Sequence, residues 1–209
     1  GRIERVDLTT GEVSVVYAEC EDHELRGPND IVFDAQGGFW FTDHGKTRGR
    51  DRDRTGVYYG TVDGKNIVEA ISPMEAPNGI GLSPDETTLY VAETPTGRLW
   101  AYPLLGPGQI DQNERPVMMA QLPDYHMFDS LAVDAEGNIC VATLITGGIT
   151  IHSPDGADAH IIPMPDVLTT NICFGGENLK TAFITLSTTG KLVSCAWETP
   201  GLALNFLNK

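Results

Sequence analysis

DSLAVDAEGNICVAT, residues 129–143, consists of a short apolar run, a turn that contains Gly137, and a second apolar run. The pattern occurs three more times in the chain, beginning at Asn29, Asn78 and Asn171. Successive copies start 49, 51 and 42 residues apart (29 to 78, 78 to 129, 129 to 171). A fixed period in this range is typical of β units that stack or surround an axis.

Each copy opens a longer unit of short apolar runs separated by turn residues. The first three units contain four predicted strands each and the fourth contains three, while residues 2–8 and 12–19 predict a hairpin ahead of them. No stretch has a sustained helical period, so the fold class is all-β. Four-stranded units at this spacing predict a β-propeller, with about four blades and a hairpin of a fifth forming one domain over residues 1–209.

The first residue of each copy is the most informative position of the repeat. In a propeller the innermost strands start at the same end of a central channel, so we expect a ring of Asn29, Asn78, Asp129 and Asn171 there. Amide and carboxylate oxygens suit Ca²⁺ or Mg²⁺ better than Zn²⁺. Each Asn could instead bond only to local backbone, as Asn does in turns. Four such residues in register favour a binding site.

Composition and charge exclude several classes of partner and location. The net charge of −15 argues against nucleic acid, whose phosphates would be repelled. No apolar run is long enough to cross a bilayer. No two of the four cysteines are spaced as a CxxC motif, and three of them lie in apolar runs. We therefore expect buried free thiols. Free thiols favour a reducing compartment, and hence a cytoplasmic location.

Other catalytic arrangements lack their usual motifs, since there is no GxSxG, HExxH or P-loop. His44 or His126 could act as a general base, although histidines in exposed loops are common. Residues 46–54 hold five basic side chains, which predict either a solvated loop neutralised by Asp51 and Asp53 or a mobile lid.

Four stretches together resemble the gluconolactonase family, which includes senescence marker protein (regucalcin), luciferin-regenerating enzyme and a staphylococcal drug-responsive lactonase. They are PNDIVFDAQGGFWFTD, APNGIGLSPDETTLYVAET, FDSLAVDAEGNICVAT and TNICFGGENLKTAFITLSTTGKL, in family order and over essentially the whole chain. The resemblance implies a six-bladed propeller that hydrolyses lactones with a divalent cation in its channel. Ca²⁺ is the favoured cation, and Zn²⁺, Mg²⁺ or Mn²⁺ would also fit.

The resemblance also implies roles for individual residues. Asn78 matches the family's amide ligand to the metal, and Asp129 matches its carboxylate ligand and the group that activates water. Asn29 matches a residue that binds substrate or a metal-bound water. Asp30 and Ser130 match positions used around the metal in the drug-responsive branch.

Two departures from the family concern the substrate and the ligand set. Some members hold the substrate with an Arg at the position of Gly27, so the neighbouring Arg26 becomes the candidate here, together with His44 at the mouth. A Glu from the family's first blade completes the metal site. No acidic residue of residues 1–19 matches it, which predicts that the first blade is not part of this sequence.

Three functions are consistent with these observations. The favoured one is metal-dependent hydrolysis of a small-molecule lactone, in which Asp129 activates water. Strictosidine synthase-like propellers, which need no metal, share the type of segment seen at residues 78–94. A Ca²⁺-binding propeller without catalytic activity is the third.

Overall fold

The computed structural model describes residues 1–123 and 125–207, and its strands form four successive blades. Blade 1 contains β5 (Pro28–Phe33), β6 (Gly38–Asp43), β7 (Thr55–Thr61) and β8 (Ile67–Met74). Blade 2 contains β9 (Pro77–Leu82), β10 (Thr88–Glu93), β11 (Arg98–Gly106), the short β12 (Gln109–Ile110) and β13 (Val117–Gln121). All pairings within these two blades are antiparallel, as the short connections require.

Blades 3 and 4 follow the same plan. Blade 3 contains β14 (Met127–Val133), β15 (Ile139–Leu144), β16 (Gly148–His152) and β17 (Ala159–Pro163). Blade 4 contains β18 (Thr169–Gly175), β19 (Thr181–Leu186) and β20 (Lys191–Ala196), with the short 3-10 helix η1 (Glu177–Leu179) between its first two strands. The prediction of an all-β propeller with about four blades is therefore confirmed.

Two small hairpins precede blade 1. The first pairs β1 (Ile3–Val6) with β2 (Val13–Tyr17), as the sequence predicts. The second pairs β3 (Glu19–Cys20) with β4 (His23–Glu24), in the segment that joins β2 to β5.

In blades 1 and 3 a buried carboxylate holds the turn that follows the inner strand. The Oδ1 atom of Asp34 accepts hydrogen bonds from the backbone N–H groups of Gln36 and Gly38, at 3.0 and 2.9 Å. Asp134 makes the equivalent bonds in blade 3. The glycine inside each of these turns has a positive φ, 90° at Gly37 and 85° at Gly137, which L side chains rarely adopt. The Asp and Gly of the repeat thus set the strand-to-strand connection.

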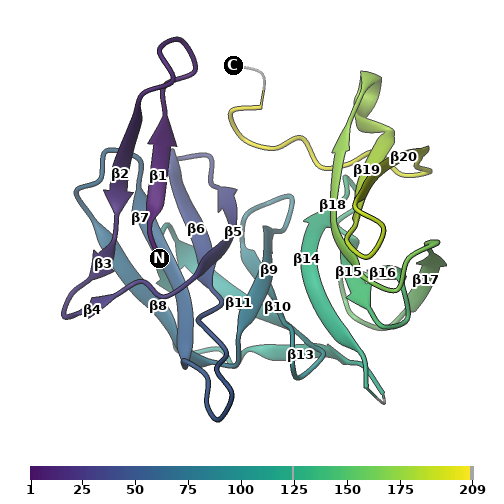
Figure 1. Cartoon of the computed structure of the whole chain (residues 1–209), viewed down its shortest axis with the longest axis horizontal. Coiled ribbons are helices and arrows are strands. Elements are labelled where there is room, and N and C mark those ends of the chain that lie inside the picture. Colours follow the sequence, from purple (N-terminus) through teal and green to yellow (C-terminus); the bar gives the residue numbers. More distant parts are fainter. Residues whose placement is uncertain (124, 208–209) are drawn as a thin grey trace.

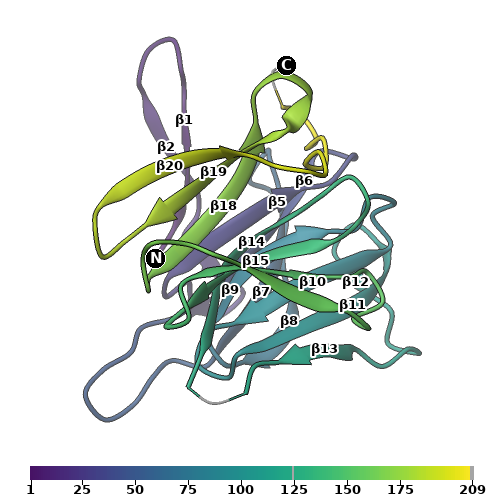
Figure 2. The same cartoon turned by 90° about the vertical axis from the view of Figure 1, so that its right-hand side faces the viewer.

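The four inner strands β5, β9, β14 and β18 lie next to one another in that order around the channel (Figure 1). Figure 2, turned by 90°, brings blades 3 and 4 to the front, with β1 and β2 faint behind them. All four strands run in the same direction, so their first residues meet at one end of the channel, called the entrance end below. The tail after β20, residues 197–207, crosses the opposite end toward blade 1 (Figure 1).

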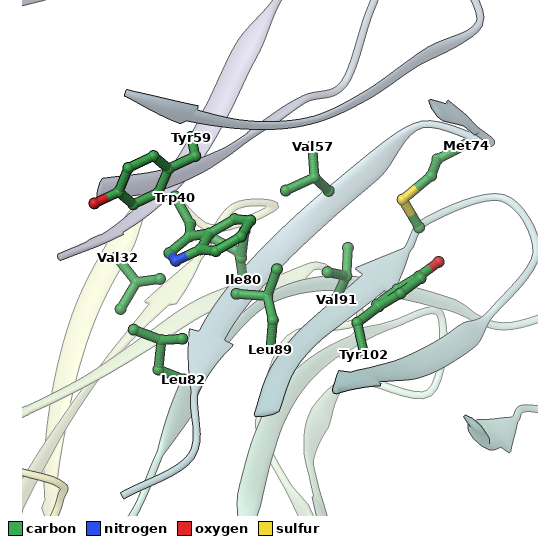
Figure 3. Close-up of a cluster of buried hydrophobic side chains, with 10 residues drawn as sticks. All are labelled: Val32, Trp40, Val57, Tyr59, Met74, Ile80, Leu82, Leu89, Val91 and Tyr102. Carbon is green, nitrogen blue, oxygen red and sulfur yellow. The ribbon is translucent and has the colours of Figure 1, made fainter. Parts of the chain in front are cut away.

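Apolar side chains fill the spaces between neighbouring blades. Figure 3 shows the cluster between blades 1 and 2, in which the rings of Trp40 and Tyr59 meet edge to face with centroids 5.0 Å apart. Equivalent clusters lie between blades 2 and 3 and between blades 3 and 4. Trp197 is buried in the last of these clusters.

The cysteines are free, as predicted, but only two of the four are buried. Cys20, in the acidic segment, and Cys140 are buried, whereas Cys173 and Cys195 are exposed. The prediction was wrong for the last two because their strands alternate, and these side chains point away from the blade interfaces.

Three further features bear on the predictions. His152 is buried at the end of β16. In the basic loop the Arg48 guanidinium lies 2.6 Å from Asp51 and 2.7 Å from Asp53, as expected of a solvated, neutralised loop. In the described part of the chain, no helix has the length and apolar character needed to cross a membrane.

Candidate functional site at the entrance of the channel

Asn78 and Asp129 meet at the entrance end, where β9 and β14 begin. The Asn78 amide Nδ2 donates to Asp129 Oδ1 at 2.7 Å and to Thr94 Oγ1 at 3.0 Å. Its Oδ1 faces the hydroxyl of Ser130, which donates to it at 3.4 Å. Asn78 is only 4% exposed, so these polar partners replace the water that its amide loses on folding.

Gly79 explains why the two strands can come this close. A Cβ atom at this position would lie 2.7 Å from both the Asp129 carbonyl oxygen and the Leu131 backbone nitrogen. Real Cβ atoms do not approach backbone atoms so closely, and neither neighbour can move without shifting β14. The Asn-Gly pair at 78 and 79 therefore positions the Asn78 side chain against Asp129.

Asp30 reaches the same region from β5. Its backbone N–H donates to Thr42 Oγ1 at 3.1 Å, and that hydroxyl donates to the Asn78 carbonyl at 2.7 Å, which links blades 1 and 2. The Asp30 carboxylate accepts from the N–H of Ile31 at 2.9 Å.

Thr42 and Thr94 also belong to the site, although neither stands at the start of a copy of the repeat. Both occur where the second run of a copy ends, in FTD and AET, and Thr143 ends the third copy's run in VAT. This recurrence of Thr is the signal that could have found them.

The two carboxylates of the site share an unusual electrostatic environment. Burial raises the pKa of Asp129 to about 6, against hydrogen bonds from Asn78 and the Ser130 backbone that lower it. Burial, with a smaller contribution from the negative charge of Asp129, raises the pKa of Asp30 to about 6, against hydrogen bonds that lower it. Both groups are therefore poised to exchange protons near neutral pH.

Three predicted residues lie outside this cluster. Asn29 and Asn171 stand at the starts of β5 and β18, where both are exposed. The guanidinium of Arg26 lies 3.5 Å from Glu24 and lines a separate hollow with His23 and Tyr58. The structure thus brings together Asp30, Asn78, Asp129 and Ser130, and leaves the other three on the surface around them.

The two candidate histidines differ in their surroundings. His44 follows β6 and is half-buried beside the Pro77 carbonyl, and this burial lowers its pKa. Its Nδ1 atom is buried and has no hydrogen-bond partner. His126 instead has its Nδ1 2.6 Å from the Thr146 hydroxyl. Of the two, His44 lies nearer to the Asn78 end of the cluster.

The donors at the entrance fit a hard cation better than a soft one. They are the oxygens of Asp30, Asn78, Asp129 and Ser130, with no sulfur or imidazole nitrogen among them, which is the chemistry that Ca²⁺ and Mg²⁺ prefer. Within residues 1–123 and 125–207 no group of three or more His, Cys, Asp or Glu side chains could hold a metal. A cation here would therefore depend on amide and hydroxyl oxygens as well as carboxylates.

Comparison with known proteins identifies the family. The family described as "SMP-30/Gluconolactonase/LRE-like region" matches residues 1–188. This chain belongs to that family. A gluconolactonase of Zymomonas mobilis is 32% identical to it over 206 residues, which cover 88% of this chain and 55% of that protein. The diisopropyl-fluorophosphatase of Loligo vulgaris is 27% identical over 201 residues, 90% of this chain and 62% of that protein. This family member thus spans less than two thirds of either relative.

The fold of the family member is also that of solved structures. A calcium-binding protein, regucalcin, from Agrobacterium tumefaciens superposes with a TM-score of 0.81 over 97% of this chain and 72% of that one. At 23% sequence identity this likeness concerns the fold alone.

Proposed function

We propose that this chain hydrolyses the ester bond of a lactone at the entrance of the channel, with Asp129 as the group that receives the proton of the attacking water. The observation that carries the proposal is the half-buried Asp129 carboxylate, held by Asn78 at 2.7 Å, with a pKa raised to about 6. A base with a pKa near the working pH combines the correct protonation state with a useful driving force for proton transfer. Family membership supports the same reaction.

The proposed reaction balances without an additional reactant. Water adds through its oxygen to the lactone carbonyl, and the Asp129 carboxylate takes up the proton that is released. The ring C–O bond then breaks, and the proton returns from Asp129 to the departing alkoxide, which becomes the hydroxyl of a hydroxy acid. The hydrogen bond from Asn78 holds Asp129 in one orientation throughout, and Ser130 in turn fixes Asn78.

A divalent cation would be held by Asp129, Asp30 and Asn78, with Ser130 and Asn29 close by, and it would supply polarisation of the lactone carbonyl. Without it, the Asn78 N–H group is what offsets the charge of Asp129.

Two candidates remain for binding the polar part of the substrate. Asn29 is exposed at the rim and can offer both a donor and an acceptor. His44 has a buried Nδ1 atom without a hydrogen-bond partner of its own. Arg26 would have to leave Glu24 before it could contribute.

The decisive experiment replaces Asp129 by Asn, which keeps the size of the side chain and removes the base. We expect kcat for a lactone such as glucono-δ-lactone to fall by about 10²- to 10⁴-fold, measured with added Ca²⁺. Asp22→Asn is the matched control, because that side chain is 98% exposed and remote from the channel. Wild-type activity in Asp129→Asn, or full activity after chelation, would refute the metal-dependent proposal. Ca²⁺ binding without turnover of any lactone would favour the non-catalytic alternative.

A second candidate reaction is hydrolysis of a fluorophosphate ester. It is favoured by the likeness to the diisopropyl-fluorophosphatase, which extends over 90% of this chain. Release of fluoride from diisopropyl fluorophosphate, assayed beside lactone hydrolysis with the same two variants, separates the two reactions.

A further inference from the structure

A cavity of about 380 Å³ begins at Asp30, beside the carboxylate cluster, and is lined by residues of all four inner strands and of the tail. Its exposed large apolar side chains include Ile31 and Phe33 on β5 and Leu204 and Leu207 in the tail. Along β14, Asp129 and Val133 lie four residues and therefore roughly 13 Å apart, at about 3.3 Å per residue.

The tail lines the far end of the cavity. Asn205 Nδ2 donates to the Phe33 carbonyl at 3.1 Å and to Glu86 Oε1 at 2.6 Å. The Leu202 N–H donates to the Val133 carbonyl at 3.0 Å. The other oxygen of Glu86 accepts from the backbone N–H of Ala35 at 3.1 Å. These bonds fasten the tail to blades 1, 2 and 3.

We propose that this cavity binds the aliphatic side chain of the substrate, and that the substrates are lactones with a neutral alkyl chain. The inference rests on the proposed function, because it places the lactone ring at Asp129 and the chain below it. A cavity of this volume accepts about a dozen groups the size of a water molecule, at about 30 Å³ each.

The lining determines the chemical class of the ligand. Ile31 and Phe33 are 42% and 37% exposed, so apolar surface that is now wet would be covered by an alkyl chain. Among the described residues that line the cavity, the only charged ones are Asp30 and Glu86, both acidic, which disfavours an anionic ligand. The polyhydroxyl chain of a sugar would need many hydrogen-bond partners, and the lining below the entrance is mainly aliphatic.

Two exposed cysteines provide a test that does not depend on catalysis. Cys173 lines the cavity, whereas Cys195, on β20, lies outside it. The probe is 3-octylcyclopentanone, a ketone that mimics an octyl-substituted γ-lactone and cannot be hydrolysed. At ten times its dissociation constant we expect it to slow maleimide labelling of Cys173 about tenfold, read by peptide mass spectrometry, without slowing that of Cys195. Cyclopentanone, which lacks the chain, should protect neither. Equal labelling of Cys173 with and without the octyl probe would overturn the proposal.

Hydrolysis assays then separate the proposed side-chain site from the proposed function. Cys173→Phe should lower kcat/KM for γ-dodecalactone at least about tenfold relative to γ-valerolactone, since each methylene kept out of the cavity loses up to about fourfold. Cys195→Phe is the control with the same change outside the cavity. If neither lactone is hydrolysed while Cys173 is protected, the reaction proposal fails and the cavity proposal stands. If γ-valerolactone is hydrolysed and Cys173 is not protected, the reverse holds.

Discussion

The four inner strands share one sequence pattern. The first residue of that pattern is nevertheless placed differently in the two middle strands, β9 and β14, than in the two end strands, β5 and β18. Asn78 and Asp129 begin β9 and β14, each of which lies between two other inner strands, and their side chains bond to each other. Asn29 and Asn171 begin β5 and β18, at the two ends of the row, and both are exposed. The repeat brings an oxygen donor to the same place in each blade, but the neighbouring strands on both sides decide whether it becomes buried and oriented.

The strongest test of this comparison is the contact between the two middle strands. Gly79→Ala places a Cβ 2.7 Å from backbone atoms of β14, so we expect it to lower the free energy of unfolding by about 3 kcal/mol or more. Gly49→Ala is the control, because a Cβ there meets nothing within 4 Å. Chemical denaturation measures both, and equal stabilities would mean that β9 and β14 are not held as closely as described.

The affinity of the candidate site for a cation should depend steeply on pH. Asp30 and Asp129 must lose their protons to act as ligands, and both have pKa values raised to about 6. We expect the calcium dissociation constant, measured by titration calorimetry, to rise by roughly 10- to 100-fold from pH 7 to pH 5. Asp30→Asn should make this dependence shallower, and Asn171→Ala should leave it unchanged. A dissociation constant that does not vary with pH would place the cation elsewhere.

Asn78, in a middle strand, and Asn171, in an end strand, should contribute differently to the free energy of unfolding. Asn78→Ala removes the partner of Asp129 and Thr94 in a buried site, and we expect a loss of about 2 kcal/mol in the metal-free protein. Asn171→Ala changes an exposed side chain and should cost less than about 0.5 kcal/mol. Denaturation in the presence of a chelator checks both, and similar losses would remove the distinction between middle and end strands.

The smallest predicted effect is the pH dependence of stability caused by Asp129. Its pKa is about 6 in the folded chain and about 3.9 when unfolded, so between these values the folded chain holds a proton that the unfolded chain releases. The metal-free wild type should therefore lose about 1 to 2 kcal/mol relative to Asp129→Asn as the pH rises from 4 to 7. Denaturation curves at several pH values measure this difference, and parallel curves for the two proteins would contradict it.

Much of the fold was predictable because it depends on local pattern. Alternating apolar runs, the Asp and Gly of the turns and the period of the copies together predict the strands of all four blades. The local pattern misled for Cys173 and Cys195, since an apolar run does not say which of its residues face a neighbouring blade. It also left out Thr42, whose bond to the Asn78 carbonyl joins residues 36 positions apart in the chain.

The sequence by itself determined the repeat, the blades and the presence of one oxygen donor at the start of each inner strand, because these follow from side-chain chemistry and short-range geometry. Only the tertiary structure decided that Asn78 and Asp129 form the bonded pair, that Arg26 lies against Glu24, and that the tail lines a cavity in the channel. Burial, pKa and enclosure depend on groups that lie far away in the chain, so no single stretch contains them.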